Sequence, residues 1–221
     1  MTVIPAVEAA GVTVRREGVV VLDGLDLVVR PGELVAVTGP SLSGKTTLVE
    51  LLAGWARPDA GTVTWNGEAT PPPWSSLGVV PQAFALLEEL TVLENIDLAS
   101  RFDHADRRDG HADRADRADR TDRDAHRDEL LDRLGLDRLR HRGAFEVSVG
   151  ERQRTMVARA LADRPAVVLA DEPVAHQDER HAGVVLDLLH AAVSDGAACI
   201  VASRAPDIAA LADSVLDLTR L

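Results

Sequence analysis

The sequence predicts an α/β fold in which helices cover a mainly parallel sheet. Two observations carry this prediction. First, the last third of the chain alternates short apolar stretches with helical ones, which are AVVLADE (166–172), DERHAGVVLDLLHAAVSDG (178–196), AACIVAS (197–203), APDIAALADS (205–214) and VLDL (215–218). Second, a glycine-containing turn at residues 39–47 lies between an apolar strand and a helical stretch. Both patterns are typical of parallel strands joined by helices.

The N-terminal part is rich in β-branched residues and predicts further strands. These strands are AGVTV (10–14), VVVLDGLDLVV (19–29), ELVAVTG (33–39), GTVTWNGE (61–68) and LGVVPQ (77–82). The dipeptide Asn66-Gly67 predicts a turn at the end of the fourth strand. Between the strands, TTLVELLAGWAR (46–57) has helical spacing and stops at Pro58.

Length, composition and charge limit the class of protein. A chain of 221 residues suits one domain, with or without a smaller subdomain, and 46% hydrophobic residues suffice for a core. The sequence has no apolar run of membrane-spanning length and no signal-peptide layout at its start. The net charge of -12 argues against a general nucleic-acid binder. Cys199 is the single cysteine, and its apolar surroundings predict a buried, unpaired thiol. A lone cysteine agrees with a reducing cytosol, so we expect a cytoplasmic protein. From the charge, we expect no nucleic-acid partner.

Residues 103–129 contain a repeat of Ala-Asp-Arg that differs from the rest of the chain. Aspartates with an arginine four residues later favour a helix. Because the repeat is three residues long and a helix has about 3.6 residues per turn, successive Asp and Arg side chains would point in different directions around the helix. This helix would therefore be charged on every side and unable to bury a face. We expect a solvated helix or linker, with a docking surface as the less favoured alternative.

The stretch GPSLSGKTT matches the phosphate-binding pattern G-x-x-x-x-G-K-[ST]. It follows the predicted strand LVAVT and opens a helix, which is the context that this motif requires. The amides of the loop and the helix N-terminus would face phosphate, Lys45 would reach the outer phosphates, and Thr46 can hold Mg²⁺. We therefore expect the chain to bind a nucleoside triphosphate. The residues of the loop are Gly39, Pro40, Ser41, Leu42, Ser43, Gly44, Lys45, Thr46 and Thr47.

Two acidic residues end the predicted strand AVVLADEP (166–173). Asp171 would hold Mg²⁺ directly or through water, and Glu172 would polarise an attacking water. A strand that ends in two acids is common by itself. The phosphate loop upstream makes the functional interpretation the stronger one.

The stretch VSVGERQR (147–154) has the form of a helix start. Ser148, followed three residues later by Glu151, predicts a capping box that satisfies free amides. The helical spacing continues through GERQRTMVARALADR to Pro165. Such an N-terminus is also a site for anions.

The phosphate loop, VVPQ with Gln82, VSVGERQR and AVVLADEP, in this order, resemble the ATP-binding subunit of ABC transporters. The resemblance covers nearly the whole chain and extends to LEELTVLENI after Gln82, which looks most like the lipoprotein-release and macrolide-export branch. It implies a single ABC ATPase domain over residues 1–221 with a P-loop NTPase (RecA-like) fold. The core, with an antiparallel β subdomain, would comprise 1–83 and 151–221, and a helical subdomain at 84–150 would contain the repeat.

The resemblance also implies roles for single residues. VSVGERQR is similar to the family's signature motif, which in a head-to-tail dimer presses on the ATP held by the partner's phosphate loop. By this resemblance, the further nucleotide-binding residues are Arg16, Ser148, Gly150, Glu151 and Asp178. The catalytic residues would be Glu172, Lys45, Gln82 and Arg204. The Mg²⁺ ligands would be Thr46, Gln82 and Asp171.

Two departures from the family pattern lie in the phosphate loop and the signature. Leu42 and Val149 stand where the family has glycine. If Ser148 caps the helix, Val149 lies in its first turn and costs up to about 0.7 kcal/mol. A positive φ at Val149 would instead cost about 1–3 kcal/mol. We favour the smaller cost, with some crowding near the phosphate.

Further departures from the family pattern lie at the residue that would stack on adenine, at the family's switch histidine and before Asp178. Arg16 stands where the family stacks an aromatic residue on adenine, and a guanidinium can also stack, although a solvated surface charge is an equal alternative. Arg204 replaces the switch histidine and cannot cycle a proton near neutral pH. Gln177 is unusual before Asp178.

The implied protein is an ATP hydrolase, with ATP and Mg²⁺, that drives a membrane permease on a separate chain. It would act as a homodimer or a heterodimer with another ABC subunit, peripheral on the inner face of the membrane. Because the binding residues are kept while those that tune hydrolysis are altered, we expect reduced turnover. The alternative is a non-transport switch that dimerises on ATP with little hydrolysis. Arg204 favours this alternative, whereas Glu172 opposes it.

Overall fold

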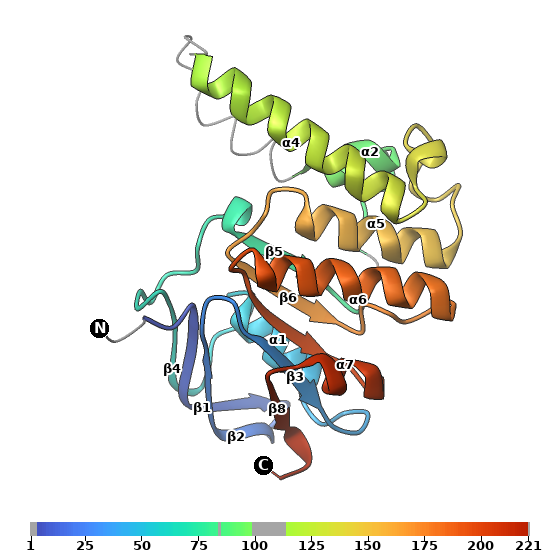
Figure 1. The fold of residues 1–221 in the computed structure, drawn as a ribbon. Helices are drawn as coiled ribbons and strands as arrows, with labels where there is room; N and C mark the ends of the chain where they lie inside the picture. The colour runs from blue at the N-terminus through green and yellow to red at the C-terminus, as the bar shows by residue number, and fades with distance from the viewer. Residues whose placement is uncertain (1–3, 84, 99–113, 221) are drawn as a thin grey trace.

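A five-stranded parallel sheet forms the centre of the molecule (Figure 1). The computed structural model describes residues 4–83, 85–98 and 114–220. The strand order is β5-β6-β7-β3-β8, and each neighbouring pair is parallel. The bounds are β3 (Leu34–Thr38), β5 (Leu77–Val80), β6 (Val167–Asp171), β7 (Ala198–Ala202) and β8 (Ser214–Asp217). The predicted α/β fold is confirmed.

Strand β6 shows why these strands are continuous apolar runs. All five of its residues are buried. Val168 and Ala170 belong to one hydrophobic core, whereas Val167 and Leu169 belong to another. Successive side chains of a strand point to opposite faces, so a sheet covered on both faces needs apolar residues at every position.

Helices cover one face of the parallel sheet, whereas a helix and a second sheet cover the other (Figure 1). One core includes residues of α5 (Val149–Leu161), α6 (Glu179–Ser194) and α7 (Pro206–Leu211). The other includes α1 (Lys45–Leu52) and a second, antiparallel sheet of order β2-β1-β4. The strands of that sheet are β1 (Val7–Arg16), β2 (Val19–Val29) and β4 (Ala60–Trp65).

Helix α1 is shorter than the sequence predicts, because it ends at Leu52 rather than near Pro58. Gly54 adopts a φ of 74°, and its amide donates to the Leu51 carbonyl. The amide of Trp55 donates to the Glu50 carbonyl. These are the bonds of a glycine-terminated helix end, so a local glycine stops the helix before the proline does.

Two other sequence predictions are confirmed. Asn66 and Gly67, with φ of 49° and 81°, form a two-residue turn in which Trp65 and Glu68 exchange both backbone bonds. Cys199 is buried and unpaired, and burial raises the pKa of its thiol to about 12. Among the described helices, none is both long and apolar enough to cross a membrane.

The charged repeat contributes to one long helix, α4 (Arg114–Arg133), beside the short helix α2 (Val92–Ile96) (Figure 1). Residues 103–113 of the repeat lie outside the described residues. Between residues 120 and 129 no side chain is fully buried and most are exposed, which agrees with the prediction that the repeat could not bury a face; Arg127 is nevertheless partly buried. The side chain of Arg127 is only 18% exposed, and its guanidinium lies within 2.9–3.6 Å of the carboxylates of Asp97, Asp124 and Asp128.

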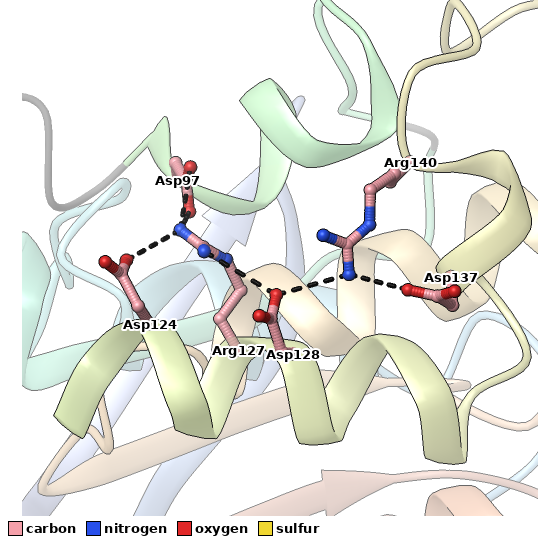
Figure 2. A network of polar contacts seen from close by, with 6 residues as sticks. All are labelled: Asp97, Asp124, Arg127, Asp128, Asp137 and Arg140. Atoms are coloured by element: carbon pink, nitrogen blue, oxygen red, sulfur yellow. Dashed lines mark hydrogen bonds and ion pairs between the residues drawn. The ribbon is translucent and has the colours of Figure 1, made fainter. Parts of the chain in front are cut away.

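This network explains how a charged segment can dock (Figure 2). Arg140 continues it by contacting Asp128 and Asp137 at 3.3 and 2.6 Å. A guanidinium carries five donors, so several carboxylates from different elements can surround it and replace water. The carboxylate of Asp97, just after α2, thereby joins α2 to α4. The subdomain boundaries at residues 84 and 150 remain a prediction.

Candidate nucleotide-binding site

The phosphate loop connects the end of β3 to the start of α1, as predicted. Gly44, the residue before the helix, has a φ of 96°, and a Cβ there would lie 2.9 Å from a Leu22 methyl group. Leu42 adopts a φ of 69° and is fully exposed. The left-handed conformation strains a leucine, whereas the two pattern glycines accept it freely. Leu42 therefore holds a backbone conformation that favours glycine and places its apolar side chain on the outer surface of the loop.

Lys45 and Ser43 show that this loop fits a phosphate. Lys45 is buried as a residue, and its ammonium donates to the carbonyls of Gly39 and Pro40, each at 2.8 Å. Within the described part of the chain, the buried Ser43 hydroxyl has no hydrogen-bond partner. A phosphate oxygen would satisfy this hydroxyl and attract the ammonium.

Three oxygen-bearing side chains meet at the start of α1. The hydroxyl of Thr46 donates to Oδ2 of Asp171 at 2.5 Å and lies 3.1 Å from Oε1 of Gln82. Burial raises the pKa of Asp171, and the bond from Thr46 opposes that rise. Hydroxyl, carboxylate and amide oxygens are ligands of the kind that Mg²⁺ prefers. The three predicted metal ligands thus fit this ion chemically.

Glu172 lies beside this cluster on the segment that follows β6. Its backbone has a φ of 50°, and its amide donates to the Ala202 carbonyl at the end of β7. Its carboxylate accepts a bond from the Ser203 hydroxyl at 3.0 Å and pairs with Nε of Arg204 at 3.2 Å. The Glu172 side chain is 14% exposed, whereas that of Arg204 is 66% exposed. Both oxygens of the candidate base are therefore held by residues after β7.

One cavity of about 450 Å³ brings most of the predicted residues together. It is lined by Val21, Ser41, Leu42, Gly44, Lys45, Thr46, Thr47, Gln82, Asp171, Glu172 and Arg204. Val21 and Ser203 were not singled out from the sequence. Ser203 follows a buried strand directly, which is a signal that could have indicated it; Val21 lies inside a long strand and has no such signal.

The structure places Arg16 outside the lining of this cavity. Its guanidinium pairs with Glu50 on α1 at 3.1 Å, and half of its side chain is exposed. Stacking of Arg16 on adenine stays a prediction.

The signature residues lie at the start of α5 and do not line the cavity of their own chain. The predicted capping box is present: the amide of Glu151 donates to the Ser148 hydroxyl, and the amide of Ser148 donates to Glu151 at 2.7 Å. This second bond lowers the pKa of Glu151. Val149 is the first helical residue, with 39% exposure and no positive φ, so the smaller of the two predicted costs applies.

Asp178 also lies away from the phosphate loop, as the N-cap of α6. Its carboxylate accepts the amide of His181 at 2.8 Å, which lowers the pKa of Asp178. Gln177, its neighbour, bonds to Arg154 and to the Gly150 carbonyl. The sequence marked Gln177 as unusual but did not reveal these partners, because they lie more than 20 residues away.

Comparisons with known proteins agree with this geometry. A protein-family model described as "ABC transporter" matches residues 22–175. The lipoprotein-releasing system ATP-binding protein LolD of Chromohalobacter salexigens is 36% identical over 92% of this chain and 86% of its own. The macrolide export ATP-binding/permease protein MacB of Azoarcus is 30% identical over 97% of this chain, which corresponds to 33% of its own length.

A solved structure extends the likeness to the fold. It is described as a dimeric, post-hydrolysis state of an ATP-binding cassette bound to ADP and Pi. It is 26% identical, with a TM-score of 0.80 over 96% of this chain and 93% of the other. The family match covers the phosphate loop, Gln82, the signature helix and the two acids in one continuous stretch. The chain therefore belongs to the ABC transporter family, as an ATP-binding subunit with that family's ATPase domain.

Proposed function

We propose that this chain hydrolyses Mg²⁺-ATP in its phosphate-loop cavity, as half of a head-to-tail dimer that drives a membrane permease on a separate chain. The observation that carries the proposal is the meeting of Thr46, Gln82 and Asp171 from three separate elements around one hydroxyl. Such convergence behind a phosphate loop suits Mg²⁺, which these three residues would hold next to the phosphates of ATP. Association with a permease would place the protein on the inner face of the membrane.

Five residues of the cavity would take part in this reaction. Lys45 would exchange its two carbonyl partners for the phosphates, whose charge it balances. Mg²⁺, held by Thr46, Gln82 and Asp171, would neutralise charge that develops on the transferred phosphoryl group. Glu172 would accept a hydrogen bond from the attacking water and orient it for in-line attack.

The dimer is supported by the exposed start of α5. Ser148 and Val149 lie at a helix N-terminus, where backbone amides and the helix dipole favour an anion. Their own chain's phosphate loop is not adjacent, so the phosphate would come from ATP bound to a second subunit. Either a second copy or a different ABC subunit could supply it.

An apolar groove beside Gln82 supports the permease partner. It has a volume of about 480 Å³, and Pro81 and Ala85 are part of its wall. Trp55 and Trp74, which are 46% and 57% exposed, also line it, with ring centroids 6.4 Å apart. Exposed tryptophans around an apolar groove are typical anchors of protein interfaces. We assign the groove to an apolar segment of the permease, because a segment there would lie next to a residue of the ATP site.

Basal turnover should be slow because the candidate base is restrained. Arg204 and Ser203 each hold one oxygen of the Glu172 carboxylate. Moving this carboxylate toward a water bound at ATP requires stretching the contact with Arg204.

The test is ATP hydrolysis by the purified wild type and by Glu172→Gln, with ATP binding measured on both. We expect both proteins to bind ATP and the variant to lose turnover by at least about 100-fold. Glu68→Gln, an exposed change in the turn after β4, is the matched control and should keep the wild-type rate. Wild-type turnover in Glu172→Gln would contradict the role of Glu172, and absence of ATP binding in both would contradict the proposed site.

A further inference from the structure

The leucine of the phosphate loop is unfavourable in the isolated chain. Leu42 lines the rim of the nucleotide cavity, its side chain is fully exposed, and its backbone holds a φ of 69°. A left-handed backbone strains a leucine, and an exposed apolar side chain stays in contact with water. The contacts within its own subunit therefore give no physical reason for a leucine at this position.

A second exposed apolar surface lies at the start of α5. Val149 is 39% exposed, and Phe145, four residues before it, is 49% exposed. The centroid of the Phe145 ring lies 5.3 Å from Cζ of Arg152, which is three residues after Val149 on α5. Both apolar side chains therefore flank the same end of the helix. We call Phe145 and Val149 the apolar signature end.

The proposed head-to-tail dimer brings these two apolar features together. Ser148 and Gly150 would contact the ATP of the partner, and Val149 lies between them in the chain. Leu42 lies three residues before Lys45, in the loop that would hold that ATP. Successive Cα atoms are about 3.8 Å apart, so a shared phosphate leaves Leu42 of one subunit within side-chain reach of Val149 of the other.

We propose that Leu42 of each subunit packs against the apolar signature end of a second copy of this chain, an inference that rests on the proposed head-to-tail dimer. Twofold symmetry forms the contact twice, so the apolar area that it removes from water is doubled. Leu42 and Val149 both stand where the family pattern has glycine. A subunit that follows the pattern offers Leu42 no side chain at position 149, so the contact selects a second copy over a different ABC subunit.

The test measures dimerisation of the full-length chain at saturating ATP by analytical ultracentrifugation. The parent protein is Glu172→Gln, in which ATP should persist. Leu42→Asn removes the apolar side chain and keeps a residue that tolerates a left-handed backbone. We expect it to raise the Kd of the dimer about tenfold, equivalent to about 1.4 kcal/mol. Ile4→Asn changes another apolar residue, 62% exposed and close to the turn at Gly67, and should leave this Kd unchanged.

A double variant tests whether the two glycine positions contact each other. Val149→Thr keeps the branched Cβ, replaces a methyl group with a hydroxyl, and should raise the Kd of the dimer by at least about threefold. If Leu42 and Val149 are in contact, the double variant raises Kd no more than Leu42→Asn alone, because that contact is already lost. Effects that multiply to about thirtyfold would overturn the contact.

Mixing experiments test the choice of partner. When the parent is mixed with copies that carry glycine at positions 42 and 149, we expect the parent to pair with itself, and random pairing would overturn the selection of a second copy. An unchanged Kd in Leu42→Asn would overturn the inference and leave the proposed dimer intact. If ATP causes no dimerisation of the parent Glu172→Gln, the proposed dimer is refuted as well.

Discussion

The ion pair between Arg204 and Glu172 yields a quantitative prediction about turnover. Substitution Arg204→Ala should raise kcat for ATP hydrolysis, because it frees one oxygen of the candidate base. The Arg204 side chain is 66% exposed, so solvent screens the pair and its strength falls within the range of surface ion pairs, about 0.2–1 kcal/mol. If the whole of this free energy opposes movement of the carboxylate, kcat rises by about fivefold at most.

The assay is steady-state phosphate release at saturating Mg²⁺-ATP, with Kd for ATP measured in parallel. Arg204→Lys keeps the positive charge and should stay within about twofold of the wild type. Arg30→Ala removes a similarly exposed arginine, paired with Glu33 at 3.8 Å far from the cavity lining, and should leave kcat unchanged. A fall in kcat for Arg204→Ala would refute the reasoning, because it would mean that Arg204 stabilises the transition state more than it restrains the base.

Three other predictions concern the permease groove, the buried thiol and the charged network. Trp74→Ser should weaken co-purification with the permease while ATP binding and permease-free hydrolysis remain unchanged; equal co-purification would remove the groove as the docking site. Cys199, with its pKa raised to about 12 by burial, should stay protonated at pH 8, and a thiol reagent should modify it only as fast as the protein unfolds. Arg127→Ala should lower stability by about 1–2 kcal/mol, or Tm by about 2–8 °C, because it leaves neighbouring carboxylates uncompensated. Arg133→Ala, which loses one looser pair at 3.6 Å, is its control and should cost below about 0.5 kcal/mol; equal shifts would contradict the network's role.

The features that the sequence predicted correctly are those whose signal lies within a few adjacent residues. The phosphate loop combines a strand end, two glycines and a helix start, and the capping box of Ser148 and Glu151 spans a single turn. The buried strands are apolar at every position because helices or a second sheet cover each face. Local signals do not always fix where an element ends. Both Gly54 and Pro58 can end a helix, and the structure shows that Gly54 ends α1.

Contacts between distant segments required the tertiary structure. Thr46 and Asp171 are 125 residues apart, and only the packing of α1 against the sheet brings their oxygens to 2.5 Å. The partner of Arg204 could not be read from its position either, because Glu172 reaches it across the ends of two neighbouring strands, β6 and β7. The partners of Arg127 also required the tertiary structure, because Asp97 reaches it only once α2 and α4 pack together.

By itself, the sequence determined the α/β class and the family resemblance, and it indicated the groups that we propose to bind phosphate and metal, because these depend on local propensity and on short motifs. The tertiary structure decided how those groups restrain one another. In the tertiary structure Arg204 pairs with Glu172, and Gln177 donates to the Gly150 carbonyl in the first turn of α5. Trp55 and Trp74 line one groove. Strand order and helix packing set these distances, which no local pattern encodes.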